Sequence, residues 1–134
     1  MANEIRNKYR SSVTAQASAA ISADAYSTGT QDVIDVSASS GDYVGCQALD
    51  CYINVTSAPS TAATCELYME ASYDGGSNYA DEEYCLSCEV PTSTGRYHLG
   101  LLTGLPGTCK LKIKAIDYGF TASLEVVPIL FEVQ

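Results

Sequence analysis

Residues 109–116 alternate strictly between small or apolar side chains and lysines, and no other pattern in the chain constrains the fold as much. The apolar positions are Cys109, Leu111, Ile113 and Ala115, and the intervening ones include Lys110, Lys112 and Lys114. Successive side chains of a β-strand point to opposite faces of the sheet. The segment therefore predicts a strand with one face in a core and the other toward solvent.

Other segments are rich in Val, Ile and Tyr and are separated by Gly, Pro or Asp turn residues, which is typical of strands. They cover residues 32–37, 43–56, 65–73, 84–90, 96–102 and 120–133. Pro128 lies inside the last of them and predicts a bend or an edge position there. At 134 residues the chain is most simply one domain. Many short strands joined by short turns predict an all-β single-domain β-sandwich, of jelly-roll or immunoglobulin-like type.

Residues 1–10 are a mixed-charge leader, and residues 11–40 are rich in Ser, Ala and Thr and poor in large apolar side chains. We expect residues 1–30 to form an extended N-terminal arm, with the β-sandwich domain over residues 31–134. A helix over residues 14–25 is the competing interpretation, since Ala is frequent there. Ser and Thr interrupt that segment, and large apolar residues at helical spacing are missing.

The cations of the chain are concentrated in two short segments. Arg6, Lys8 and Arg10 occupy alternate positions near the start, and no Lys or Arg follows until Arg96. A basic extended arm can dock on an acidic surface, and Ile5 and Tyr9 are candidate apolar anchors for it. A disordered leader is the alternative, and in either case we expect removal of residues 1–10 to leave the stability of the sandwich nearly unchanged.

The row formed by Lys110, Lys112 and Lys114 has two interpretations. Lysines on an exposed strand face keep a sheet soluble and discourage edge-to-edge pairing. The same row could instead face a partner protein.

Charge and hydropathy exclude several classes of partner. The formal net charge is −9, which disfavours nucleic acid because phosphate binding needs clustered cations. No stretch approaches the roughly 20 apolar residues of a membrane span. The polar first residues do not resemble a signal peptide. We therefore expect synthesis in the cytoplasm, or export without a signal peptide.

Few residues offer catalytic chemistry. His98 is the single histidine, so a zinc site with several histidine ligands is excluded and a hydrolase triad would depend on this one residue. The acidic run Asp81, Glu82 and Glu83 could bind calcium through loop carboxylates or could be a solvated loop. We expect no catalytic residues, no cofactor and no required metal.

The six cysteines include a CxxC at Cys85 and Cys88. Acidic, strand-like flanks should raise the pKa of these thiols, which opposes redox catalysis. A zinc site and disulfides remain alternatives, although a cytoplasmic chain begins with reduced thiols. Cys65 and Cys109 lie on the apolar phase of their strands, so we expect them to be buried.

Several segments together resemble one group of proteins. These are the start MANEI, the extended Ser/Ala/Thr arm, the segment SYDGGSNY at 72–79, and GRYHL at 95–99 followed by a Leu-Pro-Gly turn. The combination resembles small all-β virion proteins of tailed bacteriophages, most closely head decoration (cement) proteins. The resemblance implies a non-enzymatic dimer or trimer on the capsid surface of the virion, with the major capsid protein as partner and terminal arms reaching onto the shell.

The expected function is therefore structural: decoration and stabilisation of a phage capsid by clamping neighbouring capsid subunits. The alternative is a tail or fibre component that binds a host surface glycan or protein. A small hydrolase or metal-dependent enzyme is the third possibility.

Overall fold

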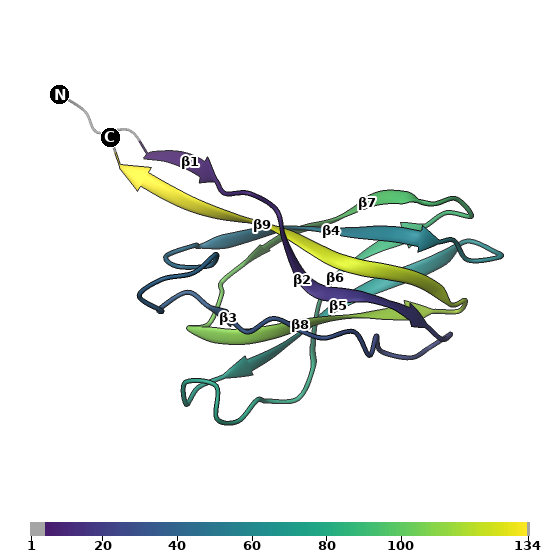
Figure 1. Ribbon diagram of the computed structural model, residues 1–134, viewed down its shortest axis with the longest axis horizontal. Helices are drawn as coiled ribbons and strands as arrows, with labels where there is room; N and C mark the ends of the chain where they lie inside the picture. Colours follow the sequence, from purple (N-terminus) through teal and green to yellow (C-terminus); the bar gives the residue numbers. More distant parts are fainter. Residues whose placement is uncertain (1–4, 134) are drawn as a thin grey trace.

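The computed structural model describes residues 5–133, which form nine strands and no helix. The strands are β1 (Ile5–Tyr9), β2 (Val13–Ile21), β3 (Ile34–Asp35), β4 (Ala48–Ser57), β5 (Ala63–Ser72), β6 (Glu83–Val90), β7 (Gly95–Thr103), β8 (Thr108–Ile116) and β9 (Phe120–Val133). They make two antiparallel sheets that face one another (Figure 1). The all-β sandwich expected from the sequence is confirmed, and the helix alternative over residues 14–25 is wrong.

The strand pairing is that of a long hairpin rolled into a sandwich. β5 pairs with β6, β4 with β7, β3 with β8 and β2 with β9, all antiparallel. Rolling places β9 beside β4 and β8 beside β5. Sheet A then has the order β2-β9-β4-β7, with β1 also on β9, and sheet B has the order β3-β8-β5-β6. This nested arrangement is the jelly-roll topology rather than the immunoglobulin one.

The core lies between the sheets and comes from the apolar phase of each strand. Leu111 and Ile113 of β8 are fully buried, as the alternating pattern predicts. They pack in one cluster with Leu67 of β5, Ile53 of β4 and Leu124 of β9. Burial of one such side chain contributes about 1.5–3 kcal/mol.

Residues 5–21, which the sequence analysis assigned to the arm, are extended and also belong to sheet A. β1 and β2 pair one after the other with the same edge of β9. Ala15 and Ile21 of β2 lie in the core.

Pro128 lies at the junction between β1 and β2. Its carbonyl accepts a hydrogen bond from the Arg10 N–H at 2.9 Å, while β2 begins its pairing at Val126 and β1 at Ile129. Pro128 therefore lies where β9 passes from one partner strand to the other, so its missing N–H interrupts neither the β1 nor the β2 register.

Two expected strands are shorter in the structure. The segment 43–56 becomes strand only from Ala48, and 32–37 only over Ile34–Asp35. Tyr43 and Cys46 are nevertheless buried, and the Tyr43 hydroxyl donates to Asp32 at 3.1 Å. Their apolar character reflects a packed loop, which composition alone does not distinguish from a strand.

Candidate functional site

The first predicted site residues lie on a two-stranded ribbon that extends from one end of the sandwich (Figure 1). We define the terminal ribbon as β1 together with Ile129–Val133 of β9. Its register runs from Ile5 opposite Val133 to Tyr9 opposite Ile129. The predicted arm is thus held by backbone pairing with the last strand of the chain.

One face of the terminal ribbon is apolar and open. Tyr9 is 61% exposed and Phe131 is 48% exposed, and Leu101 of β7 is 51% exposed beside them. These three side chains line a cavity of about 330 Å³, together with Asn7, Ala48, Asp50 and Ile129. We call it the apolar cavity. Ala48 and Ile129 are buried but lie outside the sandwich core cluster, so they form its floor.

The predicted cations accompany a second cavity of about 390 Å³, lined by Lys8, Tyr9, Arg10, Ser11, Gly41 and Asp42. Arg10 Nη1 donates to the Asp42 carbonyl oxygen at 2.9 Å, which ties the base of the ribbon to the loop before β4. Only the backbone of Ile5 and Arg6 is described, so the predicted roles of their side chains lie outside the described residues.

The second predicted set, Lys110, Lys112 and Lys114, lies on the outer face of sheet B and contacts tyrosines of the same chain. Lys110 Nζ is 4.4 Å from the Tyr79 ring centroid, and Lys112 and Lys114 are 4.5 and 5.0 Å from that of Tyr26. All three lysines are half-buried. The three lysines therefore contact aromatic rings from two loops of their own chain.

Lys112 also joins two carboxylates. Its Nζ is 2.5 Å from Glu82 and 3.6 Å from Glu70. Burial by itself would lower the pKa of Lys112, but the hydrogen bond to Glu82 and the nearby charges raise it. The hydrogen bond from Lys112 lowers the pKa of Glu82. Glu82 belongs to the acidic run considered for calcium, and its structural partner is an ammonium group.

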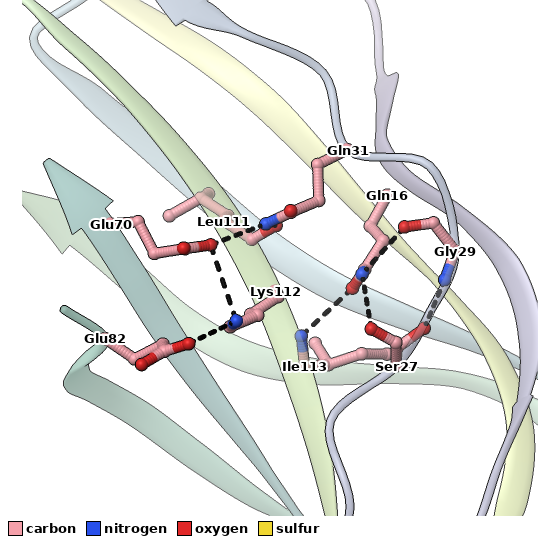
Figure 2. A network of polar contacts seen from close by, with 9 residues as sticks. All are labelled: Gln16, Ser27, Gly29, Gln31, Glu70, Glu82, Leu111, Lys112 and Ile113. Atoms are coloured by element: carbon pink, nitrogen blue, oxygen red, sulfur yellow. Dashed lines mark hydrogen bonds and ion pairs between the residues drawn. The ribbon is translucent and has the colours of Figure 1, made fainter. Parts of the chain in front are cut away.

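A buried polar network beside this row locks three elements together (Figure 2). Gln16 of β2 is 1% exposed, and its Nε2 donates to the carbonyls of Ser27 and Gly29 at 3.2 and 3.1 Å. Its Oε1 accepts from the N–H of Ile113 at 3.0 Å. Nothing in the sequence pattern distinguishes this glutamine from a surface residue.

The segment 27–31 fits against β2 and β8 through the same network. Gln31 Nε2 donates to the Leu111 carbonyl at 2.9 Å and to Glu70 at 3.1 Å (Figure 2). A Cβ at Gly29 would lie 2.0 Å from the Ala17 carbonyl oxygen, so only glycine permits this close approach. The network thus holds the segment 27–31 against β2 and β8.

His98 lies in a surface cluster on the outer face of sheet A. Its Nε2 is 2.6 Å from Asp50 Oδ1, and the Tyr52 hydroxyl donates to Asp50 Oδ2 at 2.7 Å. Arg96 lies 4.1 Å above the Tyr52 ring and 3.9 Å from Glu125. Within the described residues, no Ser, Thr or Cys side chain is hydrogen-bonded to His98, so this pair lacks the nucleophile of a triad.

The six cysteines are free thiols in this structure. Cys65 and Cys109 are fully buried, as expected from their strand phase. Burial raises the pKa of Cys88 to about 11 and that of Cys51 and of Cys109 to about 12. The predicted rise for Cys85 is also found, with burial as its main cause and Glu83 second. In the part of the chain that the structure describes, no three His, Cys, Asp or Glu side chains are grouped as metal ligands.

Neither the family models nor the curated proteins nor the solved structures contain a match to this chain. None of the described residues belongs to a helix that is long and apolar enough to span a membrane.

The candidate site is therefore chosen on structural grounds, and it is the terminal ribbon with its apolar cavity. The sequence pointed to it only through Tyr9 and the nearby cations. Leu101 and Phe131 had no sequence signal, because each is one of many apolar residues in a strand.

Proposed function

We propose that this chain is a non-enzymatic structural protein of a bacteriophage particle. It decorates the capsid surface and stabilises it by clamping neighbouring subunits of the major capsid protein. It is made in the host cytoplasm and acts as a dimer or trimer on the virion. The terminal ribbon is the element that contacts the shell.

The observation that carries this proposal is the exposed apolar face of the terminal ribbon. Tyr9 and Phe131 project from a segment that stands away from the sandwich, where they contribute little to the core. Exposed aromatic residues around a cavity are typical of protein interfaces. A ribbon with backbone pairing loses less conformational entropy on docking than a disordered arm would.

The positions of the cations support docking of the ribbon on a capsid shell. Lys8 and Arg10 place cations at the ribbon, on a chain whose formal net charge is −9. Individual exposed ion pairs contribute only about 0–1 kcal/mol. On a many-copy shell, avidity can multiply such weak contacts into high occupancy. The jelly-roll fold occurs in viral capsid proteins, which is a fold-level analogy only.

The alternative function, glycan binding by a tail or fibre component, has less support from the outer face of sheet A. Tyr52, the aromatic residue of the His98 cluster on this face, is covered by Arg96 at 4.1 Å and flanked by His98 at a ring distance of 4.8 Å. An open stacking platform for a sugar ring is therefore missing at this cluster.

The test uses purified particles and particles stripped of this protein. We expect many copies on the capsid, and we expect deletion of residues 1–10 to abolish rebinding. The double variant Lys8→Gln/Arg10→Gln should rebind less tightly at low salt, and its difference from the wild type should shrink as salt increases, because salt screens the charges that only the wild type carries. Arg96→Gln, which neutralises an exposed cation on the sandwich, is the matched control and should rebind normally. Location on the tail alone, or full rebinding of the deletion, would contradict the proposal.

A further inference from the structure

In the described part of the chain, one edge of β9 has no strand beside it at the C-terminal end of the strand. β4 pairs with β9 from Ser57 opposite Thr121 to Ala48 opposite Ile129. β9 continues to Val133, with β1 on its other edge. Among residues 5–133, no strand pairs with the β4-side edge of β9 beyond Ile129. The position in line with β4 is therefore a vacant strand position of sheet A.

The residues before Ala48 do not continue β4 along β9, and the cause is local. Gly45 has φ +70°, and its N–H donates to the Val36 carbonyl at 2.9 Å. Cys46 is buried in the core. The residues that would have extended β4 alongside β9 are thus turned into the sandwich.

The Gln47 side chain forms a hydrogen bond that the backbone of a longer β4 would otherwise form. Gln47 Oε1 accepts a hydrogen bond from the Phe131 N–H at 2.8 Å, and the Gln47 N–H donates to the Ile129 carbonyl at 2.9 Å. An amide oxygen takes the place that a peptide carbonyl would occupy in a continuous ladder. Alternate residues of a strand direct their backbone groups to the same edge, so Val133 shares the orientation of Phe131.

The apolar cavity adjoins the same edge. Tyr9, Leu101 and Phe131 form its exposed walls, and Ile129 lies in its floor. A strand added beside Phe131 would direct every second side chain to the outer face of sheet A. An apolar side chain at such a position would meet the cavity.

We propose that the edge of β9 at Phe131 and Val133 accepts an extended peptide segment of a partner protein. The segment adds antiparallel to β9, in line with β4, and seats an apolar side chain in the apolar cavity. Backbone hydrogen bonds supply affinity and the cavity supplies specificity, which is the logic of β-strand addition. Asp50 at the cavity rim and the net charge of −9 favour a segment without acidic residues.

This inference rests on the proposed function only for the identity of the partner, a subunit of the capsid shell. The acceptor edge is tested on the isolated protein, without particles. A displayed library of random octapeptides is selected on the wild-type protein, and the selected peptides are synthesised and titrated by calorimetry. We expect apolar residues at alternate positions and few acidic ones.

Two variants distinguish strand addition from simple apolar binding. Val133→Pro removes one N–H on the open edge and leaves the groups that pair with β1, whereas Val133→Ala keeps that N–H. We expect the proline variant to bind the selected peptides at least tenfold more weakly than the alanine variant. Phe131→Ser, which opens the cavity wall, should also weaken binding at least tenfold. Circular dichroism melting of each variant verifies that it is folded.

Several outcomes would overturn the inference. These are a failure to select any peptide, equal binding by Val133→Pro and Val133→Ala, or binding of oligosaccharides at the cavity that depends on Phe131 alone. Self-association of the purified protein that Val133→Pro abolishes would assign the edge to a second copy instead. If peptides bind as expected but the protein is absent from capsids, only the proposed function fails.

Discussion

The Phe131 N–H and the Gln47 side-chain oxygen are joined by a 2.8 Å hydrogen bond at the point where β4 ends and β9 continues. This contact marks the boundary between the closed sandwich and the terminal ribbon. On one side β9 pairs with both β2 and β4, and on the other it pairs with β1 alone.

Deletion of residues 1–10 should destabilise the sandwich modestly. The sequence alone predicts almost no effect, but β1 pairs with β9 and Tyr9 lies beside buried Ile129. We expect a loss of about 1–2 kcal/mol, or a fall in melting temperature of about 3–10 °C. Scanning calorimetry measures it, with Lys8→Gln/Arg10→Gln as the control that keeps the strand. An unchanged melting temperature would mean that the ribbon pairing adds nothing to stability.

Gln16→Leu should be among the most destabilising substitutions that leave volume nearly unchanged. It leaves the Ile113 N–H and the carbonyls of Ser27 and Gly29 without the partner they have in the structure. Buried polar groups without partners cost about 1–3 kcal/mol each, so we expect the three groups together to cost at least about 3 kcal/mol. Urea denaturation measures the change. Gln31→Leu, in a less buried position of the same network, should cost less, and the reverse order would contradict the assignment.

Asp74, which accepts hydrogen bonds from Ser72 and Asn78 in the turn after β5, should make the stability of the fold depend on pH in acid. Hydrogen bonds from the Asn78 side chain and backbone and from Ser72 lower the pKa of Asp74 from 3.8 to about 2. A carboxyl whose folded pKa lies below its unfolded value stabilises the fold above the unfolded pKa. That contribution is lost as pH falls from about 4 to about 2.

Asp74→Asn keeps a side-chain acceptor but cannot titrate, so its melting temperature should fall less between pH 4 and pH 2 than that of the wild type. Parallel melting curves for the two proteins over this range measure the difference. Superimposable pH profiles would show that the Asp74 hydrogen bonds do not contribute to acid sensitivity.

The thiols should react slowly in the native protein. Burial raises the pKa of Cys51 and of Cys109 to about 12, so almost no thiolate is present at pH 8. Titration with a chromogenic disulfide reagent at pH 8 should label at most the two half-buried thiols, Cys85 and Cys88, before unfolding. All six should react in guanidinium chloride, and fast native labelling of more than two would contradict the burial described.

Local patterning predicted most strands and left several features unpredicted. The alternation over residues 109–116 and the apolar run over 120–133 correspond to β8 and β9 with nearly the same bounds. Gln16 could not be singled out, because its three partners are backbone groups that carry no sequence signature. Phe131 and Leu101 could not be placed together, since one lies on β9 and the other on β7.

By itself, the sequence determined that the chain is all-β, where most strands lie and which face of β8 is buried. Those properties follow from side-chain alternation, which is local. Only the tertiary structure decided that the strands pair as a jelly roll, that β1 pairs with β9, and that β9 extends beyond the end of β4. The physical reason is that strands pair through backbone hydrogen bonds common to all residues, so the choice of neighbour depends on the packing of the whole sandwich.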